Sequence, residues 1–111
     1  MIRNLNNETI LAEKVRICDR FWSRLRGLLG TKKIGQGEAC WINPCNSVHT
    51  FGMTYPVDLY FLDHDHRVVA VNKNLKPNRV SPIYWNAQSV LEFSSGLDRN
   101  CQVGDRLWLK Q

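Results

Sequence analysis

The chain has 111 residues, of which 43% are hydrophobic and 23% charged, and its formal net charge is +5. This size and composition are typical of one folded domain, here expected to span residues 1–111, and they exclude a disordered chain. No apolar run approaches the ~20 residues of a membrane-spanning helix, and residues 1–7 lack the apolar stretch of a signal peptide. We therefore expect a cytoplasmic protein without a transmembrane segment.

The first predicted elements are two short strands within residues 2–17, separated by a tight turn at Asn6-Asn7. A helix is then predicted from about Asp19 to Gly30, because Asp19 is a suitable N-cap and Gly30 is suited to end a helix. Its apolar residues recur at intervals of three and four, which predicts one packed face: Phe21, Trp22, Leu25, Leu28 and Leu29.

The middle of the chain predicts strands on both sides of one irregular segment. A strand is expected over Glu38–Ile42, where Asn43-Pro44 ends it, and residues 45–55 have no regular period and predict an ordered loop. Residues 57–62 and 67–71 then predict a β-hairpin around a polar tip at residues 63–66. Alternate side chains of the first hairpin strand should face opposite sides, with Val57, Leu59 and Phe61 on one side and Asp58, Tyr60 and Leu62 on the other.

The last third of the chain predicts a basic loop at residues 72–82, a strand at 87–93, a helical turn within 96–101 and a final strand at 106–109. Together the predicted elements are six to eight short strands and one packed helix. The expected fold is therefore mainly β, a single compact barrel-like or jelly-roll-like domain.

Positive charge is concentrated in two segments. Residues 14–33 hold seven cations against the single carboxylate of Asp19, and residues 73–79 hold Lys73, Lys76 and Arg79. Such segments are one way to bind nucleic acid or another anion. A solvated surface that keeps a small protein soluble is the simpler interpretation.

The four cysteines are too few and too scattered for a disulfide framework: Cys18, Cys40, Cys45 and Cys101. They also lack the paired C-x-x-C spacing of a structural zinc site. We expect reduced and mostly buried thiols.

Five motifs occur in a characteristic order: R-L-R-G-L-L-G from Arg24, S-V-H-T-F-G-M-T-Y-P-V-D-L-Y-F-L-D from Ser47, R-V-V-A-V from Arg67, V-L-E-F-S-S-G from Val90 and V-G-D from Val103. With these motifs the chain resembles the DUF192 family of small, mostly bacterial domains of undefined function. The histidine at position 49 resembles a His-containing branch of that family. The resemblance implies a barrel-like or jelly-roll-like fold with one helix near an opening, and it implies no activity.

Cys45 and His49 form the sharpest local arrangement of reactive side chains. At this spacing they are candidate catalytic residues, with a thiol nucleophile and an imidazole base. With Cys40 they are also candidate ligands of a metal such as Zn²⁺. The alternative is structural: Cys45 is a small buried group and His49 hydrogen-bonds the backbone of the loop.

Asp58 is an acid in an apolar strand, so it must be hydrogen-bonded or paired if it is buried. It is a candidate partner for His49 or for a bound ligand, and its structural alternative is to accept hydrogen bonds from the amides of the loop at residues 47–55. His64 and His66 alternate with two aspartates at the hairpin tip, where solvated turn residues are expected.

The function that these patterns favour is a ligand-binding or accessory module rather than an enzyme. Its binding site is expected at the mouth of the fold, near His49, Thr50, Met53 and Asp58. The ligand is a small molecule or a protein, and no cofactor is expected. The alternatives are a Cys/His-dependent or metal-assisted enzyme, and an anion or nucleic-acid binder that uses the basic segments.

Overall fold

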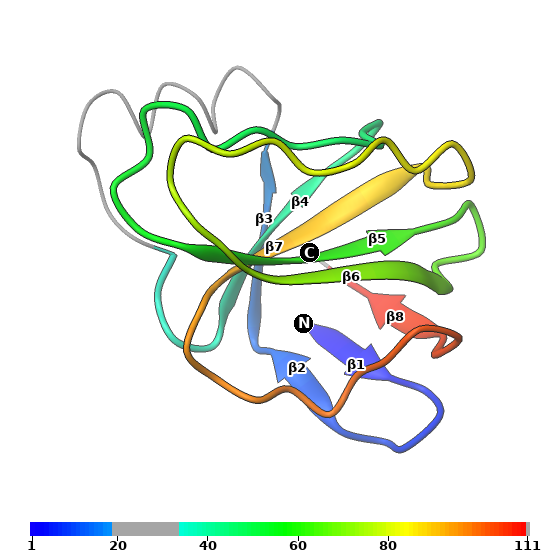
Figure 1. The fold of residues 1–111 in the computed structure, drawn as a ribbon. Coiled ribbons are helices and arrows are strands. Elements are labelled where there is room, and N and C mark those ends of the chain that lie inside the picture. Colours follow the sequence, from blue (N-terminus) through cyan, green and yellow to red (C-terminus); the bar gives the residue numbers. More distant parts are fainter. Residues whose placement is uncertain (19–33, 111) are drawn as a thin grey trace.

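The computed structural model describes residues 1–18 and 34–110, which form eight strands in two sheets (Figure 1). A three-stranded sheet has the order β2-β1-β8, and a five-stranded sheet has the order β3-β4-β7-β5-β6. The pairing of β3 with β4 is parallel, and the other strand pairs are antiparallel. The strand bounds are β1 (Ile2–Asn4), β2 (Ile10–Ala12), β3 (Lys14–Cys18), β4 (Glu38–Ile42), β5 (Val57–Leu62), β6 (Val68–Leu75), β7 (Ser89–Ser94) and β8 (Leu107–Leu109).

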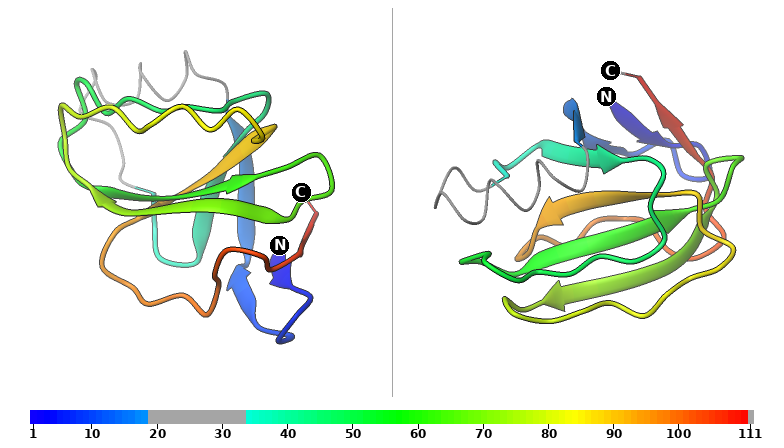
Figure 2. Two further views of the ribbon diagram at one scale, coloured as in Figure 1. Left: turned by 45° about the vertical axis from the view of Figure 1, so that its right-hand side comes forward. Right: turned by 90° about the horizontal axis from the view of Figure 1, so that it is seen from above.

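The small sheet joins the two ends of the described chain. Strand β1 pairs with β8, so the N- and C-terminal segments lie side by side (Figure 2). An isolated bridge between Arg67 and Arg106 links the start of β6 to the start of β8. The larger sheet is therefore covered on one face by the smaller one.

The two faces of the five-stranded sheet carry separate apolar layers. Strand β5 is buried along its whole length, and its side chains alternate between the layers as the sequence predicts. We call the layer between the two sheets the inter-sheet core; it contains Tyr60, Leu62, Leu91 and Phe93. We call the opposite layer the ribbon-side core; it contains Val57, Leu59, Phe61 and Val90.

The ribbon-side core is covered by two irregular segments, residues 45–51 and 79–88, which we call the covering ribbon. They run antiparallel across the sheet, joined by backbone hydrogen bonds from Thr50 N to Arg79 O at 2.8 Å and from Ser81 N to Val48 O at 2.8 Å. Tyr84 N donates to Asn46 O and Cys45 N to Gln88 O, each at 2.9 Å. Figure 1 shows both segments side by side above the sheet. Because its amides are paired across the two segments, the ribbon is an ordered element without regular strand geometry.

The structure confirms part of the predicted strand pattern. Strands β4 and β5 have the predicted bounds, and residues 45–55 form the predicted irregular segment. Residues 2–17 were expected to hold two strands, but β1, β2 and β3 share this region. Strand β6 continues to Leu75, inside the predicted basic loop, because Leu75 pairs with Val57 of β5.

Three other expectations need correction or concern residues that the structure does not describe. The prediction of a barrel-like fold is wrong, because the larger sheet does not close on itself. Strands β3 and β6 are its two edges, and the three-stranded sheet packs on it as a separate layer. Residues 96–101 are irregular, with bends at Gly96 and Asn100, instead of the expected helical turn. The predicted helix at Asp19–Gly30 lies outside the described residues. Nothing within residues 1–18 and 34–110 forms a helix of the length and apolarity that crossing a bilayer requires.

Candidate functional site

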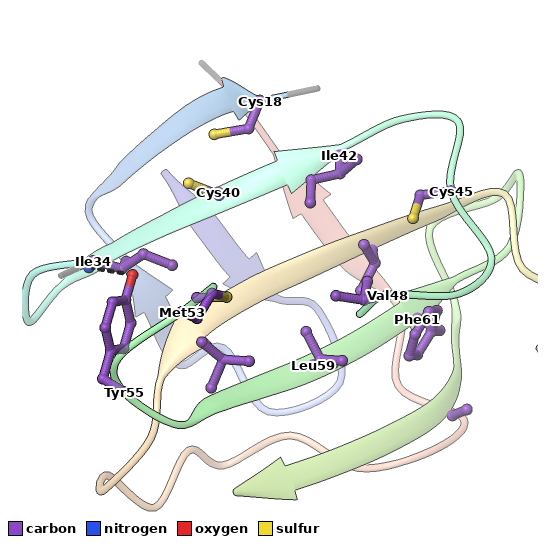
Figure 3. Close-up of a cluster of buried hydrophobic side chains, with 13 residues drawn as sticks. Cys18, Ile34, Cys40, Ile42, Cys45, Val48, Met53, Tyr55, Leu59 and Phe61 are labelled. Carbon is purple, nitrogen blue, oxygen red and sulfur yellow. Dashed lines mark hydrogen bonds between the residues drawn. The ribbon is translucent and has the colours of Figure 1, made fainter. Parts of the chain in front are cut away.

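The four cysteines all lie in the described part of the chain, where they are buried thiols outside any disulfide. Cys18, Cys40 and Cys45 belong to the ribbon-side core (Figure 3). The Cys45 thiol donates a hydrogen bond to the Ser47 carbonyl at 3.1 Å. A nucleophilic cysteine acts as the thiolate, which has no hydrogen to donate.

His49 lies at the outer side of the covering ribbon, opposite Val80 in an isolated bridge. Its ring stacks on Phe51, with ring centroids 5.3 Å apart and an angle of 28° between the ring planes. Cys45 instead packs inward with the ribbon-side core. Among the described residues, no three His, Cys, Asp or Glu side chains form a group that could hold a metal ion, so Cys40, Cys45 and His49 are not gathered as a metal set.

Thr50 and Met53 are both buried. The Thr50 hydroxyl donates to Lys76 O at 2.6 Å and accepts from Arg79 N at 2.9 Å. The Met53 side chain is part of the ribbon-side core. The Thr50 hydroxyl therefore ties the ribbon to the backbone of residues 76 and 79, and Met53 packs in the core that the ribbon covers.

Asp58 lies on the opposite face of β5 and is ion-paired with Arg99, whose Nη1 is 2.9 Å from the Asp58 Oδ2. The other carboxylate oxygen accepts a hydrogen bond from Asn74 N at 2.8 Å. The expected acceptor role of Asp58 is therefore confirmed, but the expected partners are wrong. Its donors come from β6 and from the chain after β7, because the even positions of β5 face away from the loop at residues 47–55.

Arg99 organises a buried polar group at the edge of the inter-sheet core. Besides Asp58, it donates from Nη2 to Ser94 O at 3.0 Å, and its guanidinium lies 4.1 Å from the centroid of the Phe93 ring. Nearby, burial and the Asp105 carboxylate raise the pKa of the Cys101 thiol to about 12. Burial likewise raises the pKa of Tyr60. Both groups are therefore neutral near pH 7.

The outward side of the covering ribbon exposes large apolar side chains. Trp85 is 82% exposed, and the exposed fractions of Phe51, Val80 and Ile83 lie between 50% and 58%. We call these four residues together with His49 the outer face. Their neighbours Val48, Thr50 and Ser81 are buried, so side chains alternate between the core and the solvent along the ribbon.

The two chain segments that contain the outer face carry positive charges and no carboxylates. The chain has no Asp or Glu at residues 43–57 or 66–91, whereas Lys73, Lys76 and Arg79 all lie in the second of these ranges. All three are exposed, and Lys73 lies 3.8 Å from the Asp98 carboxylate. The sequence pattern revealed the cations but not the outer face, because the pairing of the two ribbon segments leaves no regular alternation of apolar and polar residues. The sequence signal that could have indicated this surface was a group of large apolar residues within a stretch that contains no Asp or Glu.

An open surface pocket of about 330 Å³ lies beside Cys45 and is lined by Pro44, Cys45, Asn46, Ala87 and Gln88. A second pocket, of about 370 Å³, includes Ile10, Leu97 and Arg99 in its wall. Both have the volume of a small-ligand site. Of the five residues that line the pocket of about 330 Å³, Cys45 is the one with a chemically reactive side chain.

The fold and the site together describe a two-sheet, mainly-β domain with one irregular covering element. The DUF192 family profile, described as "Uncharacterized ACR", matches residues 2–109. The chain belongs to the DUF192 family. The assignment to its His-containing branch stays a prediction.

Individual proteins resemble the chain in sequence or in fold. A "UPF0127 protein" of Thermococcus sibiricus is 28% identical over 114 residues, which cover 96% of this chain and 73% of the relative. The solved structure of a protein of unknown function from Novosphingobium aromaticivorans superposes with a TM-score of 0.70 at 20% identity, covering 86% of this chain and 74% of the other. A Sinorhizobium meliloti protein named as a candidate transcription regulator superposes with a TM-score of 0.65 at 20% identity, covering 85% of this chain and 79% of the other. At this identity the structural likeness shows the fold alone.

Proposed function

We propose that this protein is a binding or accessory module, and that the outer face of the covering ribbon is its binding surface. The observation that carries the proposal is Trp85, an indole with 82% of its surface exposed on an ordered element. Tryptophan is enriched at the centres of binding interfaces, and exposed apolar patches on small proteins are frequently functional. A bacterial, cytoplasmic setting is part of the same proposal.

The ordered backbone of the ribbon supports this function. Its cross-segment hydrogen bonds and the buried Thr50 hydroxyl hold the outer side chains in place before any partner arrives. Binding by a surface that is already ordered loses less conformational entropy than binding by a loop that must first fold. Of the residues that the sequence suggested for a binding site, His49 is part of this proposed surface, and Thr50 and Met53 support it from within the fold.

A Cys45-dependent enzyme is the second candidate, favoured by the pocket that this residue lines. A catalytic thiol should be accessible and partly ionised at neutral pH. Cys45 is 6% exposed and donates its hydrogen to Ser47. We therefore expect iodoacetamide to alkylate Cys45 in the folded protein far more slowly than in the denatured protein at pH 7.5. A Cys45 that reacts faster when folded would favour the enzyme.

The binding proposal is tested with two tryptophan variants, Trp85→Ser and Trp108→Ser. Trp108 is a matched control, because it is also exposed but lies on β8 with the Arg3 guanidinium over its ring. Three probes are used: a short single-stranded oligonucleotide, anionic lipid vesicles and an acidic peptide. At least one should bind the wild type and Trp108→Ser equally and Trp85→Ser more weakly, by about fivefold or more. If no probe shows this dependence on Trp85, the proposal fails.

A further inference from the structure

We infer that the partner of the outer face is single-stranded nucleic acid. The inference rests on the proposed function, because it names the occupant of the same surface. Three features carry it: flat rings that are open to solvent, cations beside them, and the absence of carboxylates from both ribbon segments.

The rings offer two stacking points. The His49 and Phe51 rings already lie nearly parallel, with their centroids 5.3 Å apart, and half of Phe51 remains open to solvent. Trp85 provides the second point at the other end of the ribbon, next to the pairing of Tyr84 with Asn46. Even a fully extended chain separates positions 46 and 51 by no more than about 17 Å. A single strand of several nucleotides can therefore reach both points, and unpaired bases stack on such rings regardless of sequence.

The charges of the surface suit a phosphate backbone. Lys76 and Arg79 are exposed on the chain that leads into the second ribbon segment, and Arg79 is paired by its backbone with Thr50 of the first. Residues 43–57 and 66–91, which include both ribbon segments, contribute no carboxylate of their own that would repel phosphates. Lys73 contributes less, because the Asp98 carboxylate lies 3.8 Å from it. Two to three cations predict modest affinity with a measurable dependence on salt.

A single strand fits this surface better than a duplex. Sequence-independent duplex binding relies on phosphate contacts, whereas stacking rings require bases that are not already stacked and paired. Val80 lies directly opposite His49 and so adds an aliphatic wall beside the stacked rings, against which a sugar or base edge can pack.

The test is fluorescence anisotropy with labelled oligonucleotides of about 12 nucleotides, U12 and dT12, at low salt. Wild-type protein should bind at least one of them, and bind the corresponding duplex more weakly. Trp85→Ala and Phe51→Ala should each weaken single-strand binding by roughly 5- to 100-fold, while Trp85→Phe, which keeps a flat ring, should retain most of the affinity. Lys76→Ala and Arg79→Ala should each reduce the slope of log affinity against log salt by about 0.7.

The control variants are Trp108→Ala and Arg106→Ala, which remove an exposed ring and an exposed cation elsewhere and should leave binding unchanged. Absence of single-strand binding at low salt, or binding that ignores Phe51 and Trp85, would overturn the inference. If anionic vesicles or an acidic peptide bind in a Trp85-dependent manner while oligonucleotides do not, the nucleic-acid inference fails and the proposed function stands. If nothing binds through Trp85, both fail.

Discussion

The ion pair between Asp58 and Arg99 is a structural feature at the scale of single residues. The Arg99 side chain is 8% exposed and that of Asp58 is 3% exposed. Removing one member of a buried pair leaves the other charge desolvated and unpaired. The hydrogen bonds to Asn74 and Ser94 tie this pair to β6 and to the end of β7, so it joins segments that the sequence keeps apart.

Arg99→Ala should therefore lower the free energy of unfolding by about 3–5 kcal/mol, because the Asp58 carboxylate stays buried without its cation. Urea denaturation followed by circular dichroism measures this change. Arg106→Ala, which removes an exposed arginine, should change it by less than about 0.5 kcal/mol. Equal effects of the two variants would show that the buried pair adds nothing to stability.

The raised pKa values of Cys101 and Tyr60 predict how stability changes in alkali. The pKa of Cys101 rises from 9.0 to about 12, so between these two pH values the unfolded thiol loses its proton while the folded thiol keeps it. The unfolded state then binds fewer protons, and the free energy of unfolding must fall as pH rises. Tyr60, whose pKa is also raised, adds to the fall at higher pH.

Cys101→Ala should accordingly flatten the fall in stability above pH 9, and a series of urea denaturation curves from pH 8 to 10.5 measures it. A variant as steeply pH-dependent as the wild type would contradict the assigned pKa of Cys101. The alanine side chain also removes one sulfur atom from the core, so the comparison uses the slope against pH and not the absolute stability.

For single residues, the sequence was a good guide to which side chains are structurally important. It was a poor guide to the partners that these side chains contact. Asp58 was recognisable because an acid stood among apolar neighbours of a buried strand. Its partner was not, because Arg99 lies 41 positions away and meets it through tertiary packing. The turn expected at the hairpin tip is present, since the Asp63 Oδ1 accepts hydrogen bonds from Asp65 N and Arg67 N, and the His64 side chain is exposed. His66 departs from the expected solvated turn residue, because it is only partly exposed and its ring packs edge-on against Trp41, with the centroids 5.4 Å apart.

At the scale of elements, the covering ribbon depends on Thr50. Its hydroxyl contacts the backbone of residues 76 and 79, so one side chain joins the two segments. The lack of a regular period in residues 45–55 correctly predicted irregular backbone. It could not predict the partner segment at residues 79–88, because pairing without strand geometry leaves no alternation in the sequence.

Thr50→Val should destabilise the protein by about 1–3 kcal/mol, since the Arg79 amide and the Lys76 carbonyl lose a buried partner. Hydrogen exchange at the amides of Thr50, Arg79 and Ser81 should become faster than in the wild type. Thr54→Val changes an exposed threonine of the same loop and is the matched control. Unchanged protection in Thr50→Val would mean that the ribbon is held by the core alone.

At the scale of the whole molecule, the five-stranded sheet is shared by two apolar layers. Leu59 faces the ribbon-side core and Leu91 faces the inter-sheet core, and both are fully buried. Because every strand of the sheet borders both layers, we expect the two cores to unfold together.

Leu59→Ala and Leu91→Ala should each cost about 2–5 kcal/mol, and each variant should retain a single unfolding transition. Leu97→Ala, at an exposed position, should have little effect. Circular dichroism and tryptophan fluorescence should give the same midpoint in urea. Two separated transitions would show that the layers are independent.

The central claim is that the outer face of the covering ribbon is the surface that binds. The most direct test is an amide chemical-shift map of the ¹⁵N-labelled protein during titration with U12 or dT12. The largest changes should fall within residues 46–51 and 76–86 and on the Trp85 indole, with little change around the pocket that includes Ile10, Leu97 and Arg99. Changes centred on that pocket, or no changes at saturating oligonucleotide, would contradict the account.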